Sequence, residues 1–142
     1  MRIGINTLVA VPGETGGTQT YLQGLIENLA KVDRHNEYYL FVTSCNKGLF
    51  KIEQKNFKKL ICRISSKSLF LRVLYEQTIL PFRVWRNKID IFHFPASVSC
   101  LFPSCPSVLT LHDITPLMSP ELIPLILRYY WKFAYRFSTR RA

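Results

Sequence analysis

Short apolar runs alternate with longer amphipathic stretches along this chain of 142 residues. Five of the runs have the length and the β-branched or aromatic content of buried strands. They are Arg2–Val11, Glu37–Ser44, Phe57–Ser65, Ile89–Pro95 and Ser107–Asp113. Because helical patterns lie between several of them, the order of elements predicts a single α/β domain over residues 1–142, with a mostly parallel sheet.

Three stretches carry apolar residues three and four positions apart, which is the spacing of one helix face. They are the stretch with Leu22, Leu25, Ile26 and Leu29, then Ser68–Arg86, and then Glu121–Ala142. Thr18 is the expected N-cap of the first helix, and Glu27 with Lys31 forms an i, i+4 pair of opposite charge. Pro81 is expected to kink the second helix or to end it early, because proline lacks the N–H of the helix ladder.

Net charge is the feature of the composition that says most about possible partners. Hydrophobic residues make up 48% of the chain and charged residues 20%, which is typical of a folded domain and excludes a disordered chain. Lys and Arg number 19 against 9 Asp and Glu, a formal net charge of +10. This balance implies an acidic partner: nucleic acid, an anionic membrane surface or a phosphorylated substrate. Charge alone does not choose between them.

The cysteines and histidines do not have the spacing of a metal site. The cysteines are Cys45, Cys62, Cys100 and Cys105, and the histidines are His35, His93 and His112. We therefore expect no metal, and reduced, mostly buried thiols of a cytosolic protein. No convincing secretory signal is present, and prolines interrupt the uncharged stretch from Ile91 to His112, which argues against a transmembrane helix there.

Glycines crowd the turn before the first helix, in VPGETGGTQTYLQGLIENLAK (Val11 to Lys31). Gly13, Gly16 and Gly17 do not have the GxGxxG spacing, and no Lys-Ser/Thr pair follows them as in a P-loop. Two interpretations stay open. The N–H groups at the helix start can bind a phosphate, which glycine lets approach closely, or the glycines only make a tight turn with positive φ.

Two histidines end predicted strands, where ligands bind in open parallel sheets. His112 precedes Asp113 and could contact a substrate or move a proton. From the strand pattern alone we favour a structural histidine that bonds to a neighbouring backbone carbonyl. His93 is flanked by two phenylalanines, which favours a structural role more strongly.

The last helical stretch combines a basic stripe with aromatic residues. The stripe recurs every four residues, at Arg128, Lys132, Arg136 and Arg140. The expected apolar face is Tyr130, Phe133, Ala134 and Phe137, with Trp131 and Tyr135 as further aromatic surface. Such a helix could lie against anionic lipid headgroups. We favour the alternative, a core-packed helix with a solvated basic face, because aromatic helix faces usually pack inward.

Taken in order, five segments resemble the N-terminal half of a retaining GT-B glycosyltransferase of family four. MRIGINTL with TGGTQTYLQGLIENLAK is similar to the first strand, Gly-Gly loop and first helix of that family. LRVLYEQTILP resembles its LLWEQ–LP helix, and IDIFHFP its D-hydrophobic-F-H-x-P strand. SVLTLHDITPLMSPE is similar to its VTIHDLIPLxxPE segment, and RYYWKFAYRFSTRRA resembles the helix that follows.

The resemblance implies a Rossmann-like fold and roles for individual residues. Gly16 and Gly17 would lie beside the diphosphate of a nucleotide-sugar donor, and His112 would be catalytic, near the transferred sugar. The candidates that would support the loop or the acceptor cleft are Asp113, Glu76 and Tyr21. No metal or other cofactor is expected, which agrees with the lack of a DxD pair in the chain.

The expected function is that of the acceptor-side domain of an enzyme that transfers a sugar from a nucleotide-sugar to a polysaccharide or glycolipid acceptor. We expect a cytoplasmic protein, peripheral on the inner face of the membrane, with no nucleic acid partner. The chain departs from the family pattern because it lacks the strands that finish this domain, the C-terminal donor-binding domain and the E-x7-E motif. We therefore expect a fragment, inactive alone, that works with the missing domain or with a separate chain.

The alternative function is that of a non-catalytic basic α/β module that binds nucleic acid or another polyanion. It would explain the net charge of +10. It would not explain the glycine turn or the His112–Asp113 strand end.

Overall fold

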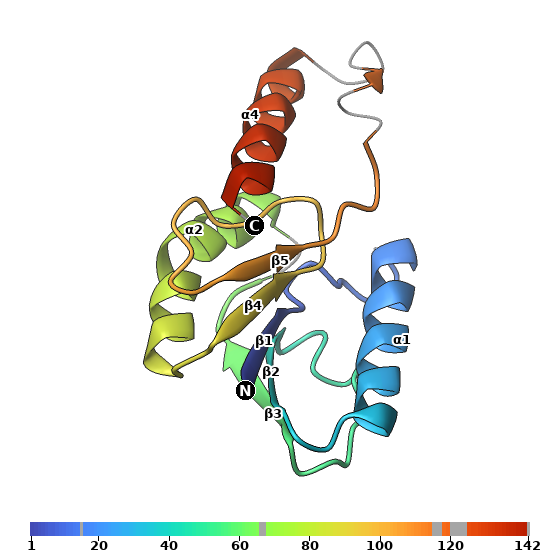
Figure 1. The fold of residues 1–142 in the computed structure, drawn as a ribbon. Helices are drawn as coiled ribbons and strands as arrows, with labels where there is room; N and C mark the ends of the chain where they lie inside the picture. Colours follow the sequence, from blue (N-terminus) through green and yellow to red (C-terminus); the bar gives the residue numbers. More distant parts are fainter. Residues whose placement is uncertain (15, 66–67, 115–117, 120–124, 142) are drawn as a thin grey trace.

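The computed structural model of the chain describes residues 1–14, 16–65, 68–114, 118–119 and 125–141, without the side chains of residues 125–127, 130, 131 and 141. In chain order, its elements are β1 (Arg2–Asn6), α1 (Gly16–Val32), β2 (Glu37–Thr43), β3 (Phe57–Cys62), α2 (Leu69–Arg86), β4 (Ile91–Phe94), β5 (Ser107–Leu109) and α4 (Leu125–Arg141). Figure 1 follows them from the N-terminus, in blue, to α4, in red.

The five strands of the sheet all run parallel, in the order β3-β2-β1-β4-β5. β1 lies at the centre, where Ile3 is opposite both Tyr38 of β2 and Ile91 of β4. β3 and β5 form the two edges. Helices flank the sheet, so the chain is a Rossmann-like α/β domain and the predicted fold class is confirmed.

Each face of the sheet has its own hydrophobic core, because α1 and α2 lie on opposite faces (Figure 1). Leu40 of β2 packs with Leu22 and Ile26 on the α1 side, and its neighbour Phe41 packs with Leu80 on the α2 side. Successive side chains of a strand point to opposite faces. A strand covered on both faces therefore reads as a nearly continuous apolar run, as in EYYLFVT.

The predicted strands are correct in place but extend too far. β1 ends at Asn6 rather than at Val11. The amide of Leu8 donates to Asn6 Oδ1 at 3.1 Å, within a turn that leaves the sheet. Leu8, Ala10 and Val11 are buried in that turn. Their apolar character therefore reflects burial rather than strand pairing, and burial is what the pattern detects.

Two local predictions for the helices are wrong, and a third is wrong in part. α1 begins at Gly16, so Thr18 lies inside its first turn and is not the N-cap. Lys31 Nζ donates to Asn28 Oδ1 at 3.4 Å instead of pairing with a carboxylate one turn away. Pro81 lies inside α2, which continues beyond it, so it does not end the helix, and the alternative of a kink stays a prediction. Caps and side-chain pairs depend on local geometry that periodicity does not define.

Candidate functional site

The segments after β1, β4 and β5 meet at the carboxyl edge of the sheet. From β1 the chain runs outward through β2 to β3, and it then returns to the other side of β1 with β4 and β5. The strand order therefore reverses between β1 and β4. In open parallel sheets, ligands bind outside the carboxyl ends of the strands at such a point.

The glycine turn lies at this edge, and its glycines differ in what the fold requires of them. Gly13 has a φ of +79°, so the turn itself favours glycine there. Gly16 and Gly17 are the first two residues of α1, have no such φ, and would meet no atom within 4 Å if they carried a Cβ. The fold thus leaves open space beside a helix N-terminus, whose N–H groups attract anions.

A buried asparagine outside the predicted set holds the turn in place. Asn46 Nδ2 donates to the carbonyl oxygens of Thr7, at 2.7 Å, and Ala10, at 3.0 Å. Its Oδ1 accepts from the amide of Thr43 at 2.8 Å. Because Asn46 is fully buried, these bonds satisfy its amide and tie the end of β2 to the segment that leads into the glycine turn.

Side chains from α1, β4 and the segment after β5 form a polar cluster. His93 Nε2 lies 2.8 Å from Thr110 Oγ1, and the Tyr21 hydroxyl lies 3.2 Å from the same oxygen. All three residues are half-buried. Burial, together with repulsion from His112, lowers the pKa of His93 below its ordinary value of 6.5. His93 is therefore a neutral hydrogen-bonding group at pH 7.

His112 lies beside this cluster and is exposed. Its Nε2 donates to the carbonyl oxygen of Pro95 at 2.7 Å. The ring of Tyr21 packs edge-on against the imidazole, with centroids 4.7 Å apart. A carbonyl only accepts, so Nε2 carries a proton and Nδ1 is the basic nitrogen of the neutral ring. The bond is the one expected of a structural histidine, and it also holds an exposed imidazole in one orientation.

α4 holds the backbone that follows His112. The Tyr135 hydroxyl donates to the carbonyl oxygen of Asp113 at 2.6 Å. Further along α4, Ser138 Oγ accepts from the amide of Ser99 at 2.9 Å. The two α4 side chains that make these bonds, Tyr135 and Ser138, are both buried. The helix therefore positions the loops after β4 and β5 from above the carboxyl edge (Figure 1).

Glu76 lies at the same edge but on α2. Its Oε1 accepts from Asn6 Nδ2, at the end of β1, at 2.8 Å. Burial raises the pKa of the Glu76 carboxyl, against smaller opposite effects of Asn6 and Arg72. A pocket of about 40 Å³ adjoins these residues, which is close to one water molecule's share of liquid volume, about 30 Å³. In this structure Glu76 links α2 to β1, and a role in an acceptor cleft stays a prediction.

α4 presents basic and aromatic side chains to solvent. Lys132, Arg136 and Arg140 are exposed, and Arg128 is half-buried. The preferred interpretation of its aromatic face is wrong at Phe133, which is 56% exposed. It is confirmed at Ala134, which is buried, and the other buried residues of the helix include Tyr135 and Ser138. The side chains of Tyr130 and Trp131 lie outside the described residues.

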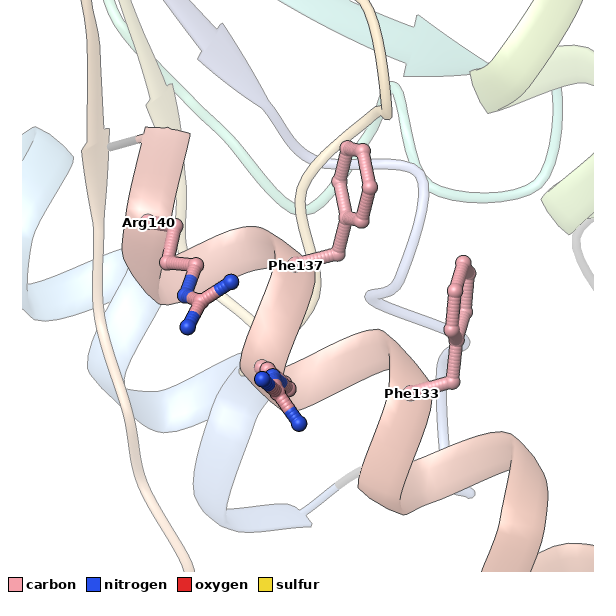
Figure 2. Close-up of a pocket in the computed structure, with 4 residues that line it drawn as sticks. Phe133, Phe137 and Arg140 are labelled. Atoms are coloured by element: carbon pink, nitrogen blue, oxygen red, sulfur yellow. The ribbon is translucent and has the colours of Figure 1, made fainter.

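A groove of about 480 Å³ follows this surface of α4, lined by Phe133, Arg136, Phe137 and Arg140. Figure 2 shows the rings of Phe133 and Phe137 projecting from the same side of the helix, with Arg140 a turn further along. The two ring centroids are 5.5 Å apart. Aromatic and cationic side chains in one groove suit a ligand that is partly apolar and partly anionic.

Other site classes find little support in the part of the chain that the structure describes. No group of three or more His, Cys, Asp or Glu in that part could hold a metal ion, and the expectation of a metal-free protein stays a prediction. None of the helices in that part is long and apolar enough to cross a membrane. The cysteines are free thiols, of which Cys62 and Cys100 are buried, Cys105 is half-buried and Cys45 is exposed.

The carboxyl edge brings together some of the predicted residues and separates others. Tyr21 contacts His112, and it lies one helical turn after Gly17 in α1. Glu76 is on α2, which covers the other face of the sheet (Figure 1). The basic residues of α4 form a third surface.

Two polar residues of the site were not predicted, Thr110 and Asn46. Thr110 joins His93 to Tyr21, and Asn46 supports the glycine turn. The available signal was a polar residue close after an apolar strand, since Thr110 directly follows β5 and Asn46 lies three residues after β2. That signal is common at strand ends, so it does not single out either residue.

Comparisons of the chain with protein-family models, with curated proteins and with solved structures find no match.

Proposed function

We propose that this chain is the acceptor-side domain of a glycosyltransferase, which transfers a sugar from a nucleotide-sugar to a polysaccharide or glycolipid acceptor. One observation carries the proposal: His112 lies beside the first turns of α1. The Tyr21 ring contacts the imidazole at 4.7 Å between centroids, and Tyr21 follows Gly17 by one helical turn. A diphosphate at the helix start and a histidine near the transferred sugar would lie on the same side of α1.

The chemistry of this arrangement suits a diphosphate. Gly16 and Gly17 have no side chains to block access to the N–H groups of the first helical turn, and the helix dipole favours negative charge there. His112 would contact the sugar, since its ring is exposed and is held through Nε2 by Pro95. The proposal includes no metal, because the chain has no DxD pair. A second domain, or a separate chain, would supply the contacts to the base and ribose.

The surface proposed to face the acceptor is that of α4. Its exposed cations and the exposed ring of Phe133 suit a lipid-linked acceptor at an anionic membrane surface. The location that follows is the cytoplasmic face of the membrane, with the protein bound peripherally.

The test compares two alanine substitutions in α1, Gly17→Ala and Gly24→Ala. Neither Cβ would meet an atom within 4 Å, and alanine is better than glycine in a helix by up to about 1 kcal/mol. Both variants should therefore be at least as stable as the wild type in thermal unfolding. In calorimetric titrations with uridine diphosphate and with inorganic pyrophosphate, Gly17→Ala should bind at least about tenfold more weakly, because the new methyl group blocks the N–H groups.

Gly24→Ala is the matched control and should bind like the wild type. Equal binding by both variants would contradict the donor-phosphate role of the helix start, and so would a wild type that binds neither ligand. The reading frame that follows Ala142 gives an independent test. A continuing or neighbouring frame that encodes E-x7-E would support the sugar-transfer proposal.

A further inference from the structure

The outward face of α2 is apolar along most of the helix. Leu71, Leu74, Thr78, Phe82 and Trp85 follow at intervals of three and four residues, so they form one stripe, here called the α2 stripe. All five are exposed, Phe82 by 56% and Trp85 by 65%. A helix that faces water normally turns polar residues outward, and this helix does the opposite. An exposed apolar patch of this kind marks an interaction surface.

The charged side chains of α2 lie beside the stripe or turn toward the protein. Glu76, its only acid, bonds to Asn6 of β1. Arg83 is half-buried and donates to the backbone of β3 at 2.8 Å. Arg86 is exposed in the last turn and is followed by an exposed Lys88. The stripe is therefore bordered at its C-terminal end by cations, with no exposed acid on the helix itself. The exposed acid that follows, Asp90, accepts from the backbone amide of Arg2 at 2.7 Å.

We propose that the α2 stripe inserts into the surface of an anionic lipid bilayer. Charge decides between a lipid and a second copy of the chain as the occupant. A second copy would carry the same net charge of +10 and the same cations at the end of the stripe, so pairing would bring like charges together. Anionic headgroups complement those cations, and acyl chains complement the apolar side chains.

The geometry of the helix suits this placement. α2 would lie in the plane of the bilayer surface, with Phe82 and Trp85, whose ring centroids are 5.7 Å apart, among the upper parts of the acyl chains. Tryptophan favours this depth because its ring is apolar and its N–H can reach water. Arg86 and Lys88 would then contact the headgroups.

The inference does not depend on sugar transfer and differs from the role proposed for α4. The cations of α4 attract headgroups through charge, which salt screens. The α2 stripe would bind the bilayer because its apolar side chains leave water. Salt does not weaken this hydrophobic contribution. At salt concentrations that remove the contribution of α4, insertion of α2 should therefore persist and lose only the share that Arg86 and Lys88 contribute.

Trp85 can report insertion directly. The chain has two tryptophans, so the variant Trp131→Phe of the 142-residue chain keeps Trp85 as the only one. On addition of phosphatidylcholine vesicles that contain phosphatidylglycerol, the emission of Trp85 should shift to shorter wavelength. Lipids brominated on their acyl chains should quench it. Vesicles of phosphatidylcholine alone should give a smaller effect, because they lack the anionic headgroups.

The substitutions that test the stripe are neutral, so electrostatic repulsion does not contribute. In the Trp131→Phe background, Leu74→Gln with Phe82→Gln should lower the vesicle partition coefficient by about tenfold or more. The control Val32→Gln changes an exposed apolar residue, 78% exposed, on α1. α1 lies on the opposite face of the sheet from α2 (Figure 1), so Val32→Gln should leave partitioning unchanged.

Three outcomes would overturn the proposal. The first is vesicle binding with no shift or quenching of Trp85. The second is an equal loss of binding in the double variant and in Val32→Gln. The third is a dimeric mass in solution without lipid that the double variant reduces to that of a monomer, since the stripe would then belong to an interface between two copies.

Discussion

Burial changes the chemistry of one carboxyl group, that of Glu76. Its pKa is raised chiefly by burial from an ordinary value of 4.5. The folded protein therefore holds this proton more tightly than the unfolded chain does. The resulting stability is fully present below the unfolded pKa and is lost as pH rises through the folded pKa.

We expect Glu76→Gln to remove this pH dependence. Glutamine keeps an Oε1 that can accept from Asn6 Nδ2, and it does not ionise. In urea unfolding, the variant should gain free energy of unfolding relative to the wild type as pH rises from below 4.5 to neutral. Glu14→Gln, at an exposed glutamate, is the control and should follow the wild type. A Glu76→Gln variant that also follows the wild type would contradict the inference.

At the scale of elements, α4 is linked to the loop that carries His112. Tyr135 is 2% exposed and donates its hydroxyl to the carbonyl oxygen of Asp113. Tyr135→Phe removes the donor and leaves that carbonyl without this partner, which should cost about 1–2 kcal/mol of stability. We expect faster amide hydrogen exchange in α4 and shifted NMR signals of the His112 ring.

Tyr129→Phe is the matched control for that change. Tyr129 lies on the same helix and is 76% exposed. Loss of its hydroxyl should alter neither the exchange of α4 nor the His112 signals. Equal effects of the two substitutions would show that the Tyr135 hydroxyl does not hold the loop.

Net charge is a property of the whole molecule, and its effect depends on where the cations lie. Arg136 and Arg140 are both exposed on α4. In flotation with phosphatidylglycerol vesicles, Arg136→Gln with Arg140→Gln should lower binding at low salt, since each cation near an anionic surface contributes about 1 kcal/mol. The variant should also lose part of its salt dependence.

Arg34→Gln is the control for a general charge effect, because Arg34 is exposed in the turn between α1 and β2. It should have little effect on vesicle binding. A wild type that does not float with the vesicles at low salt would remove the role proposed for α4. Salt-sensitive retardation of DNA, weakened equally by all three substitutions, would instead favour the polyanion-binding alternative.

The sequence predicted the order of elements because hydrophobic periodicity is a local property. Leu22 and Ile26 identify the buried face of α1 without reference to what covers it. The same locality explains the errors. The segment after Asn6 is apolar because it is buried in a turn, and Phe133 matches an apolar helix face although it is exposed. A pattern records the kind of residue at a position, whereas its burial depends on what packs against it.

By itself, then, the sequence determined an α/β domain with a parallel sheet, a strongly basic chain and a glycine turn at a helix start. Only the tertiary structure decided which side chains meet. Tyr21 is distant in the chain from Thr110 and His112, and the order of the strands brings it against both of them. Packing also decided which side chains of α2 point outward and stay exposed. Such contacts depend on strand order and helix placement, which are long-range properties that periodicity does not encode.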